Sequence, residues 1–434
     1  MSALASALSK TRRRQIPFLF LLYIVAYLDR INVGFASLQM NRALGFSATT
    51  YGLGAGIFFI SYVLFEVPSN IILARVGARV WIARIMISWG IVSSAMMFVR
   101  SAEGFYTLRF LLGLAEAGFF PGIIFYLTKW FPAAERARTV AAFMTATLVA
   151  GVIGGPVSGV LLTLDGRAGL AGWQWLFIVE GVPAIVLGFV VLRVLTDRPV
   201  DAGWLSDDER AALIASLEEG ADHGSSSAGD ALRDRRTWLM AAVYFTIPVT
   251  LYGIGFWLPQ MLKAASAGAS DVSIGLLSAI PYACGAIAMV VVGRRSDRTG
   301  ERRWHVFVPA LVSAAGLVLT PLGSGVAWTV AALSLAMAGL ASMFGPFWAL
   351  ATATMGGTSA AAAIALVNSV GNTGGFVGPY LLGAINDATQ SFAIGFVAIA
   401  VMLVAGGALV LLARQPVDTP GGRFIAPNRP FIES

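Results

Sequence analysis

Cysteine and histidine are scarce in this chain of 434 residues, which contains one cysteine and two histidines. The single cysteine, Cys284, excludes an intrachain disulfide and a cysteine-based metal cluster, and its apolar surroundings favour a buried, inert thiol. Both histidines, His223 and His305, fall between the long apolar runs or at the end of one. No catalytic constellation stands out, so we expect no metal site, no cofactor, no catalytic residues and no enzyme.

Charged residues are also few. They make up 12% of the chain, against about 25% in an average soluble domain. Hydrophobic residues make up 57% and the mean hydropathy is +0.77. Too few polar side chains remain to coat a soluble protein of this size, so the composition indicates a polytopic membrane protein. The net charge of +7 is then an orientation signal, and we expect a lipid bilayer and no nucleic acid as partner.

Apolar runs fill most of the sequence, and each is close to the roughly 20 residues that a membrane-spanning helix needs. Periodicity and length place twelve of them, so we predict an all-α membrane protein with twelve transmembrane helices. The predicted segments are 16–38, 51–74, 80–99, 105–130, 138–163, 173–195, 238–262, 273–293, 304–322, 326–352, 358–385 and 391–413.

A long polar stretch divides these segments into six and six. Within it, Ser206 and Glu209 form the capping-box pattern that opens a short amphipathic helix, and "GSSSAG" (224–229) is typical of a flexible linker. Most lysines and arginines fall on the side of this loop, which predicts that the loop and both termini are cytoplasmic. The predicted domains are an N-terminal bundle (1–197), a cytoplasmic linker (198–237), a C-terminal bundle (238–413) and a cytoplasmic tail (414–434).

The two halves resemble each other. "RVGAR" (75–79) corresponds to "RTGER" (298–302), and "GVIGGPV" (151–157) corresponds to "GNTGGFV" (371–377). Such repeats indicate two pseudo-symmetric six-helix bundles with a substrate site between them near the membrane midplane, and rocking of the bundles as the transport step.

Several motifs resemble those of the major facilitator superfamily, and "GRRSDRTGERR" (293–303) matches its signature loop almost fully. The chain is similar, within that superfamily, to the anion:cation symporter family, which includes bacterial tartrate, galactonate, glucarate and phthalate permeases. The resemblance implies the major facilitator fold and transport of an organic anion. The segments that carry it are "YLDRINVGFA" (27–36), "EVPSN" (66–70), "RFLLGLAEAGFFPG" (109–122), "YLTKWFP" (126–132) and "NSVGNTGGFVGP" (368–379).

Four ionisable residues fall deep within apolar segments: Asp29, Arg30, Arg109 and Glu116. Such groups usually mark substrate or ion pathways. Arg30 offers a permanent planar fork for a carboxylate, whereas Asp29 and Glu116 can change charge and so couple protons. Asp29 points about 100° away from Arg30 around the helix. Arg109 is assigned to proton coupling as a neighbour that tunes an acid. The alternative is a static salt-bridge network, which stabilises poorly compared with apolar packing.

Softer candidates surround these charges. We expect substrate contacts from the polar or aromatic side chains Tyr27, Tyr62, Tyr252, Trp348, Asn368 and Asn372, although the asparagines could equally bridge helices and the aromatics could equally pack. Asp297, Arg298 and Arg302 resemble the cytoplasmic latch of the superfamily, and Glu66 is assigned to a gate or to a structural role.

The leading hypothesis is a monomeric secondary transporter of the bacterial inner membrane that imports a small organic anion with protons. Sodium is not excluded as coupling ion. The first alternative is an exporter or antiporter, because "GVIGGPVSG" (151–159) resembles the glycine-proline motif of such carriers. The second is a non-transporting membrane sensor, but the loop and tail are too short for an output domain.

Overall fold

We analysed a computed structural model, which describes residues 2–132, 135, 139, 143, 145–219, 228–355 and 360–413. Every regular element in these residues is helical. The helices are α1 (Ala3–Leu44), α2 (Ala48–Val76), α3 (Ala78–Ala95), α4 (Ala102–Glu116), α5 (Phe119–Thr128), α7 (Ala146–Leu162), α8 (Gly172–Val194), α9 (Asp207–Glu219), α10 (Ala228–Arg233), α11 (Arg235–Ala265), α12 (Asp271–Thr299), α13 (Trp304–Leu319), α14 (Val326–Thr354), α15 (Ala360–Asn372), α16 (Gly374–Thr389) and α17 (Ala393–Val410).

The described part of the chain contains ten helical stretches that are long and apolar enough to cross a membrane, with α4 and α5 counted together. The shorter apolar helix α7 lies in the predicted segment 138–163, and α15 and α16 lie along the predicted segment 358–385 from Ala360 onward. The predicted all-α membrane fold is therefore confirmed.

Two predicted segments are interrupted rather than continuous. The segment 105–130 breaks between Glu116 and Phe119, because Gly118 adopts φ 85°, a left-handed conformation that only glycine adopts readily. The carbonyl of Ala117, which is buried at this break, accepts a hydrogen bond from the Ser69 hydroxyl at 2.6 Å. This break leaves Glu116 at the very end of α4. The segment 358–385 is divided at Thr373, between α15 and α16, although Thr373 itself keeps right-handed helical backbone angles.

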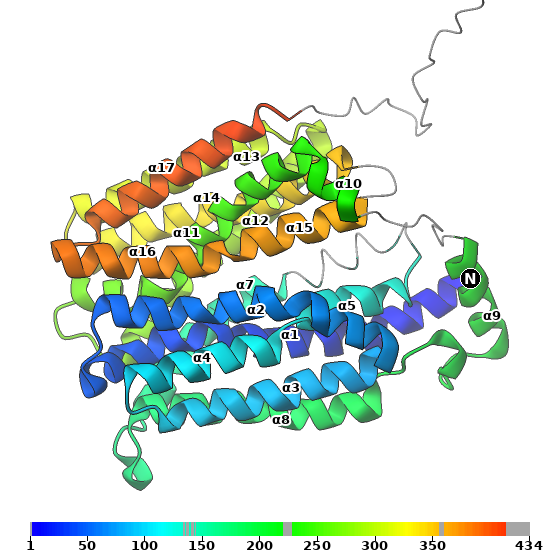
Figure 1. Cartoon of the computed structure of the whole chain (residues 1–434), viewed down its shortest axis with the longest axis horizontal. Helices are drawn as coiled ribbons and strands as arrows, with labels where there is room; N and C mark the ends of the chain where they lie inside the picture. Colours follow the sequence, from blue (N-terminus) through cyan, green and yellow to red (C-terminus); the bar gives the residue numbers. More distant parts are fainter. Residues whose placement is uncertain are drawn as a thin grey trace, which may run out of the picture.

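The helices form two bundles, with α1–α8 in one and α11–α17 in the other (Figure 1). Within the first, α3 packs along α8, and within the second, α14 packs on α12 and α13. We propose 1–197 and 238–413 as the domains, although α11 begins at Arg235, three residues before the predicted boundary. The tail 414–434 lies outside the described residues.

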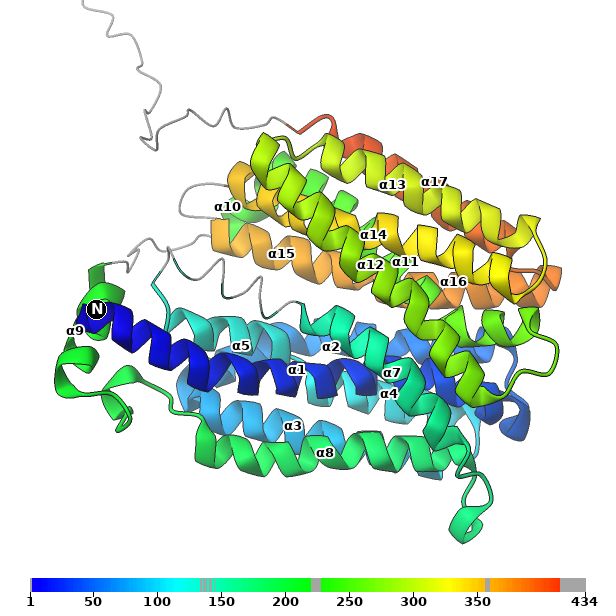
Figure 2. The same cartoon turned by 180° about the vertical axis from the view of Figure 1, so that it is seen from behind.

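The linker contributes α9 beside the N-terminal end of α1 (Figure 2). Its predicted capping box is present: the Ser206 backbone N–H donates to the Glu209 carboxylate at 2.9 Å, and the Glu209 N–H donates to the Ser206 hydroxyl at 3.3 Å. Glu209 also accepts from the Lys10 ammonium at 2.9 Å and the Ser6 hydroxyl at 2.7 Å. These contacts fix the linker helix to the start of α1.

The bundles are joined most closely at the end away from the N-terminus, where α7 packs on α12, α2 on α16 and α1 on α11. A Cβ added to Gly155 would collide with the carbonyl oxygen of Gly275, so these two helices touch backbone to backbone. The Asp387 carboxylate accepts from the backbone N–H groups of Ala48 and Thr49 at 3.0 and 2.8 Å, which neutralises the positive N-terminus of α2. We call this region the closed end.

Candidate functional site

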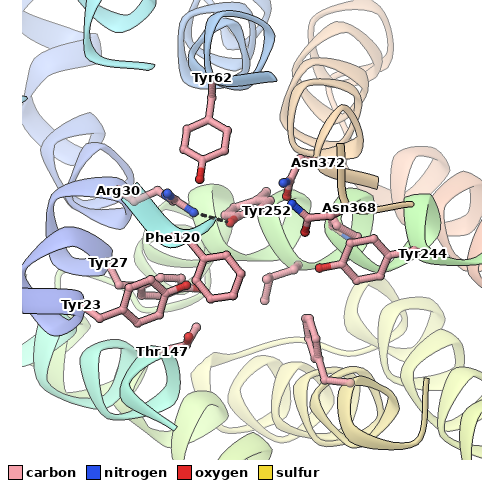
Figure 3. Close-up of a pocket in the computed structure, with 13 residues that line it drawn as sticks. Tyr23, Tyr27, Arg30, Tyr62, Phe120, Thr147, Tyr244, Tyr252, Asn368 and Asn372 are labelled. Atoms are coloured by element: carbon pink, nitrogen blue, oxygen red, sulfur yellow. Dashed lines mark hydrogen bonds between the residues drawn. The ribbon is translucent and has the colours of Figure 1, made fainter. Parts of the chain in front are cut away.

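A cavity lies between the two bundles and encloses about 550 Å³ of atom-free space, including the space at its open side. Six of the seven residues predicted to contact substrate line it, and Trp348 does not. The lining consists of Tyr23, Tyr27, Arg30, Tyr62, Phe120 and Thr147 from the first bundle and Tyr244, Pro248, Leu251, Tyr252, Phe344, Asn368 and Asn372 from the second (Figure 3).

Within the part of the chain that the structure describes, Arg30 is the one charged residue that lines the cavity. Its Nη1 donates to the Tyr252 hydroxyl at 3.2 Å, across the two bundles (Figure 3). Its Nη2 pairs with the Glu116 carboxylate. The rings of Phe58 and Tyr62 lie 5.4 Å from the guanidinium carbon, so the cation is held by aromatic faces as well as by hydrogen bonds.

Glu116 is 1% exposed and points from the end of α4 toward Arg30. The helix breaks directly after Glu116, so α4 ends at this residue and does not continue straight into α5. A substrate carboxylate that reached the Arg30 fork would therefore compete with Glu116 for the same donors. Sequence analysis placed both residues near the substrate path, and it raised an ion pair among these charges only as the alternative of a static salt-bridge network.

Asp29 lies on the opposite side of α1 and is sealed from the cavity, with 1% of its surface exposed. It accepts hydrogen bonds from the Trp89 indole at 2.7 Å, the Ser93 hydroxyl at 2.8 Å and the Asn32 amide at 3.3 Å. All three donors are neutral, so none of these three hydrogen bonds comes from a cation. The expected angle between Asp29 and Arg30 agrees with this arrangement, since Asp29 faces α3 and Arg30 faces the cavity.

Arg109 is also buried, at 1% exposure, and it does not line the cavity. Its guanidinium donates to the backbone carbonyls of Gly54 at 3.2 Å and Ala55 at 2.9 Å, and its carbon lies 5.0 Å from the Phe58 ring centroid. Arg109 and Arg30 thus share the Phe58 ring. In this geometry Arg109 joins α4 to α2, and any influence on the acids acts through space.

Glu66 bridges the bundles next to the cavity. Its carboxylate accepts from the Asn368 amide and the Ser369 hydroxyl of α15, each at 3.2 Å. Asn368 lines the cavity as well. Among the residues of the predicted latch, Arg302 donates to Asp297 at 2.6 Å, whereas Arg298 is exposed in the last turn of α12. The Asp297–Arg302 pair therefore joins the last turn of α12 to the loop that follows it.

Trp348 packs edge-on against Tyr244, with ring centroids 4.8 Å apart, and so supports the cavity wall from behind. Sequence reasoning missed several lining residues, including Tyr23, Phe120 and Tyr244. Tyr23 could have been found, because it precedes Tyr27 by four residues and so shares its helix face. No cluster of three potential metal ligands occurs in the described ranges.

Comparison with known proteins supplies the family. The model of the Major Facilitator Superfamily matches residues 19–379 and 264–433. The chain is 49% identical over 425 residues to "Putative tartrate transporter" of Agrobacterium vitis, covering 97% of both chains. It is 40% identical over 420 residues to "Quinolone resistance transporter" of Acinetobacter baumannii, covering 96% of both.

A solved structure shares the fold. A bacterial homolog of the human lysosomal transporter Spinster, in an inward-facing and occupied conformation, superposes with a TM-score of 0.76 at 18% identity, covering 93% of this chain and 96% of that one. The family match and the relatives agree with the architecture of two helical bundles around a cavity. The chain therefore belongs to the Major Facilitator Superfamily and is a multi-pass membrane transporter, not an enzyme.

Proposed function

We propose that this transporter imports a small organic anion together with protons, by alternating access of the central cavity. The observation that carries the proposal is the position of Arg30. Its guanidinium lines a cavity shared by both bundles and touches Tyr252 of the opposite bundle. A permanent cation in a site enclosed by apolar and aromatic walls favours a negatively charged group of the substrate.

Neutral polar groups on the far wall suit the rest of such a substrate. Asn368 and Asn372 each offer donors and acceptors, and tyrosines offer flat faces with a hydroxyl. This combination fits a hydroxy acid, a sugar acid or an aromatic carboxylate. The relative named a tartrate transporter supports the same class of substrate.

The pairing of Arg30 with Glu116 suggests how a proton is coupled. An anion that displaces Glu116 from Arg30 leaves a buried carboxylate without its countercharge, and such a group takes up a proton. Substrate and proton would then bind together and cross together. Asp29 is a second proton acceptor in this proposal, because its hydrogen-bond donors are neutral and its burial disfavours a permanent charge.

The chain is proposed to lie in the bacterial inner membrane as a monomer with both termini in the cytoplasm. The distribution of lysine and arginine supports this orientation. The closed end of the structure would then face outward, and the cavity would open toward the cytoplasm. Protons are the proposed coupling ions.

Export is the second candidate. The relative named a quinolone resistance transporter and the glycine-proline segment 151–159 favour it. Uptake into right-side-out and inverted vesicles under an imposed pH gradient separates the two directions, because symport concentrates tartrate on the alkaline side and antiport concentrates it on the acidic side.

The substrate class is tested by thermal shift of the purified protein against tartrate, galactonate, glucarate, phthalate and hydroxyphenylacetate. We expect at least one carboxylate to stabilise the protein, because a ligand that binds only the folded state raises its melting temperature. Matched neutral alcohols or amides should give no shift. Stabilisation by the neutral compounds alone would refute an anion site at Arg30.

A further inference from the structure

Asn368 belongs to two arrangements at once. It lines the central cavity, and its amide donates to Glu66 of the opposite bundle at 3.2 Å. Ser369, the next residue, donates to the second oxygen of the same carboxylate at 3.2 Å and does not line the cavity. The first bundle thus offers one buried acceptor, and the second offers two neighbouring donors.

Glu66 is 5% exposed, and both of its carboxylate oxygens act as acceptors. An ionised carboxylate is an acceptor only, and hydrogen bonds to an ionised group are stronger than neutral ones. Each contact joins α2 to α15. Because α2 runs from the closed end at Ala48 toward Val76, Glu66 lies one turn beyond Tyr62 on the side of the cavity away from the closed end.

We propose, on the basis of the proposed function, that Glu66 is a positioning residue that orients the Asn368 amide for the substrate while it latches α2 to α15 beside the cavity. One amide proton of Asn368 is held by Glu66, so the side chain has a fixed rotamer. Its second proton and its carbonyl oxygen remain for a substrate hydroxyl or carboxylate. Asn368 therefore contacts the substrate and also donates one of the hydrogen bonds that join the two bundles.

The geometry predicts how substrate and latch influence each other. A substrate that forms a hydrogen bond with the Asn368 amide alters the hydrogen bond between Asn368 and Glu66. The hydrogen bond from Ser369 to Glu66 remains and keeps the latch partly closed. Occupancy of the cavity is thereby communicated to the α2–α15 contact without any movement of Arg30. A merely structural bridge between helices would hold the bundles together but would not influence substrate affinity.

The latch is tested in purified protein with a Thr147→Cys reporter in a Cys284→Ser background, labelled with a maleimide in detergent. Thr147 lines the cavity, and in detergent both ends of the protein are exposed to the reagent. Glu66→Ala removes both acceptor oxygens, so we expect the labelling rate to rise roughly tenfold, as for the loss of a charge-assisted hydrogen bond. Ser369→Ala should also raise it, and Glu103→Gln, at an exposed carboxylate in α4, should not.

The positioning role is tested by the dissociation constant for tartrate. We expect Glu66→Ala to weaken tartrate binding about as much as Asn368→Ala, although Glu66 does not line the cavity. Ser369→Ala, which loosens the latch without touching the cavity, should leave the constant within about twofold. In a double-mutant cycle, Glu66→Ala should add little to Asn368→Ala, since both remove the same oriented amide.

Two results would overturn the proposal. One is a labelling rate in both Glu66→Ala and Ser369→Ala equal to that of the parent protein, which would remove the latch. The other is an effect of Glu66→Ala on tartrate binding no larger than that of Ser369→Ala, or additive with Asn368→Ala, which would remove the positioning role. If no carboxylate of the panel binds the parent protein, the proposed function fails and the positioning role fails with it, while the labelling rates still decide the latch.

Discussion

The guanidinium of Arg30 in α1 and the hydroxyl of Tyr252 in α11 are hydrogen-bonded at 3.2 Å across the two bundles. The cation proposed to bind the anion is thus held by both halves of the transporter. Any substrate that changes this contact acts at the boundary along which the bundles move. Binding and conformational change are therefore linked at a single residue.

We expect Arg30→Ala to abolish tartrate binding and transport, because the cavity would lose its charged group. Arg30→Lys keeps the charge but not the planar fork, so binding should weaken by about one to two orders of magnitude, as expected for the loss of a charge-assisted hydrogen bond. Equilibrium binding to purified protein measures both. Arg100→Ala, at an exposed arginine before α4, serves as control, and unchanged affinity in Arg30→Ala would exclude Arg30 as the anion ligand.

Glu116→Gln is expected to separate exchange from accumulation. Glutamine cannot release and rebind a proton, so tartrate exchange should continue while accumulation driven by a pH gradient stops. Tartrate added to the parent protein in weak buffer should also raise the external pH through proton uptake, and this signal should disappear in the variant. Accumulation that survives in Glu116→Gln proteoliposomes would show that the coupling proton binds elsewhere, with Asp29→Asn as the next variant to measure.

The sequence predicts the helices well because their signal is local. Long apolar runs place nearly every spanning segment, and the angle between neighbouring residues on a helix already separates Asp29 from Arg30. The Ser206–Glu209 capping box is local in the same sense and is present as predicted. Features that depend on one helix and its own residues are therefore accessible without a structure.

Features that depend on contacts between helices cannot be predicted from the sequence in this way. The choice of partner for each buried charge needs three-dimensional packing: Arg109 donates to backbone carbonyls of α2, which carry no sequence signature. The break after Glu116 depends on the left-handed Gly118 and on Ser69 from another helix. Trp348 faces Tyr244 instead of the cavity because of packing within the second bundle.

The closed end gives a third prediction. Gly155→Ala should push α7 away from α12, because the added methyl would meet the carbonyl oxygen of Gly275. Overpacking of this kind costs about 1–3 kcal/mol, so the population of molecules open at this end should rise about tenfold. Labelling of the Thr147→Cys reporter by an impermeant maleimide in right-side-out vesicles measures this population.

The matched control for that substitution is Gly345→Ala. Gly345 also lies within a helix, but a Cβ there would meet no atom within 4 Å. Both substitutions raise intrinsic helix propensity equally, so a difference between them reports the contact with Gly275. Equal labelling rates in the two variants would show that the added methyl at position 155 does not open this end, and so that the contact between Gly155 and Gly275 does not keep it closed.

The contact between the linker and α1 gives a prediction about pH. The Lys10 ammonium, the Ser206 backbone N–H and the Ser6 hydroxyl hold the pKa of Glu209 at about 2, well below its usual value. The unfolded or undocked carboxyl has a pKa of about 4.3. Glu209 therefore stabilises the docked α9 fully above about pH 4.3, and this contribution is lost as the pH falls toward 2.

Hydrogen exchange of α9 amides measures this effect when variant and parent are compared at the same pH. Glu209→Gln should exchange severalfold faster than the parent at pH 6–7, and the difference should shrink as the pH falls from 4.3 toward 2. Glutamine still satisfies the capping box, so the substitution removes the charge and keeps the helix start. Glu218→Gln, at an exposed position on the same helix, should match the parent throughout, and a Glu209→Gln difference that persists unchanged to the lowest pH would show that the ion pair with Lys10 does not hold the linker.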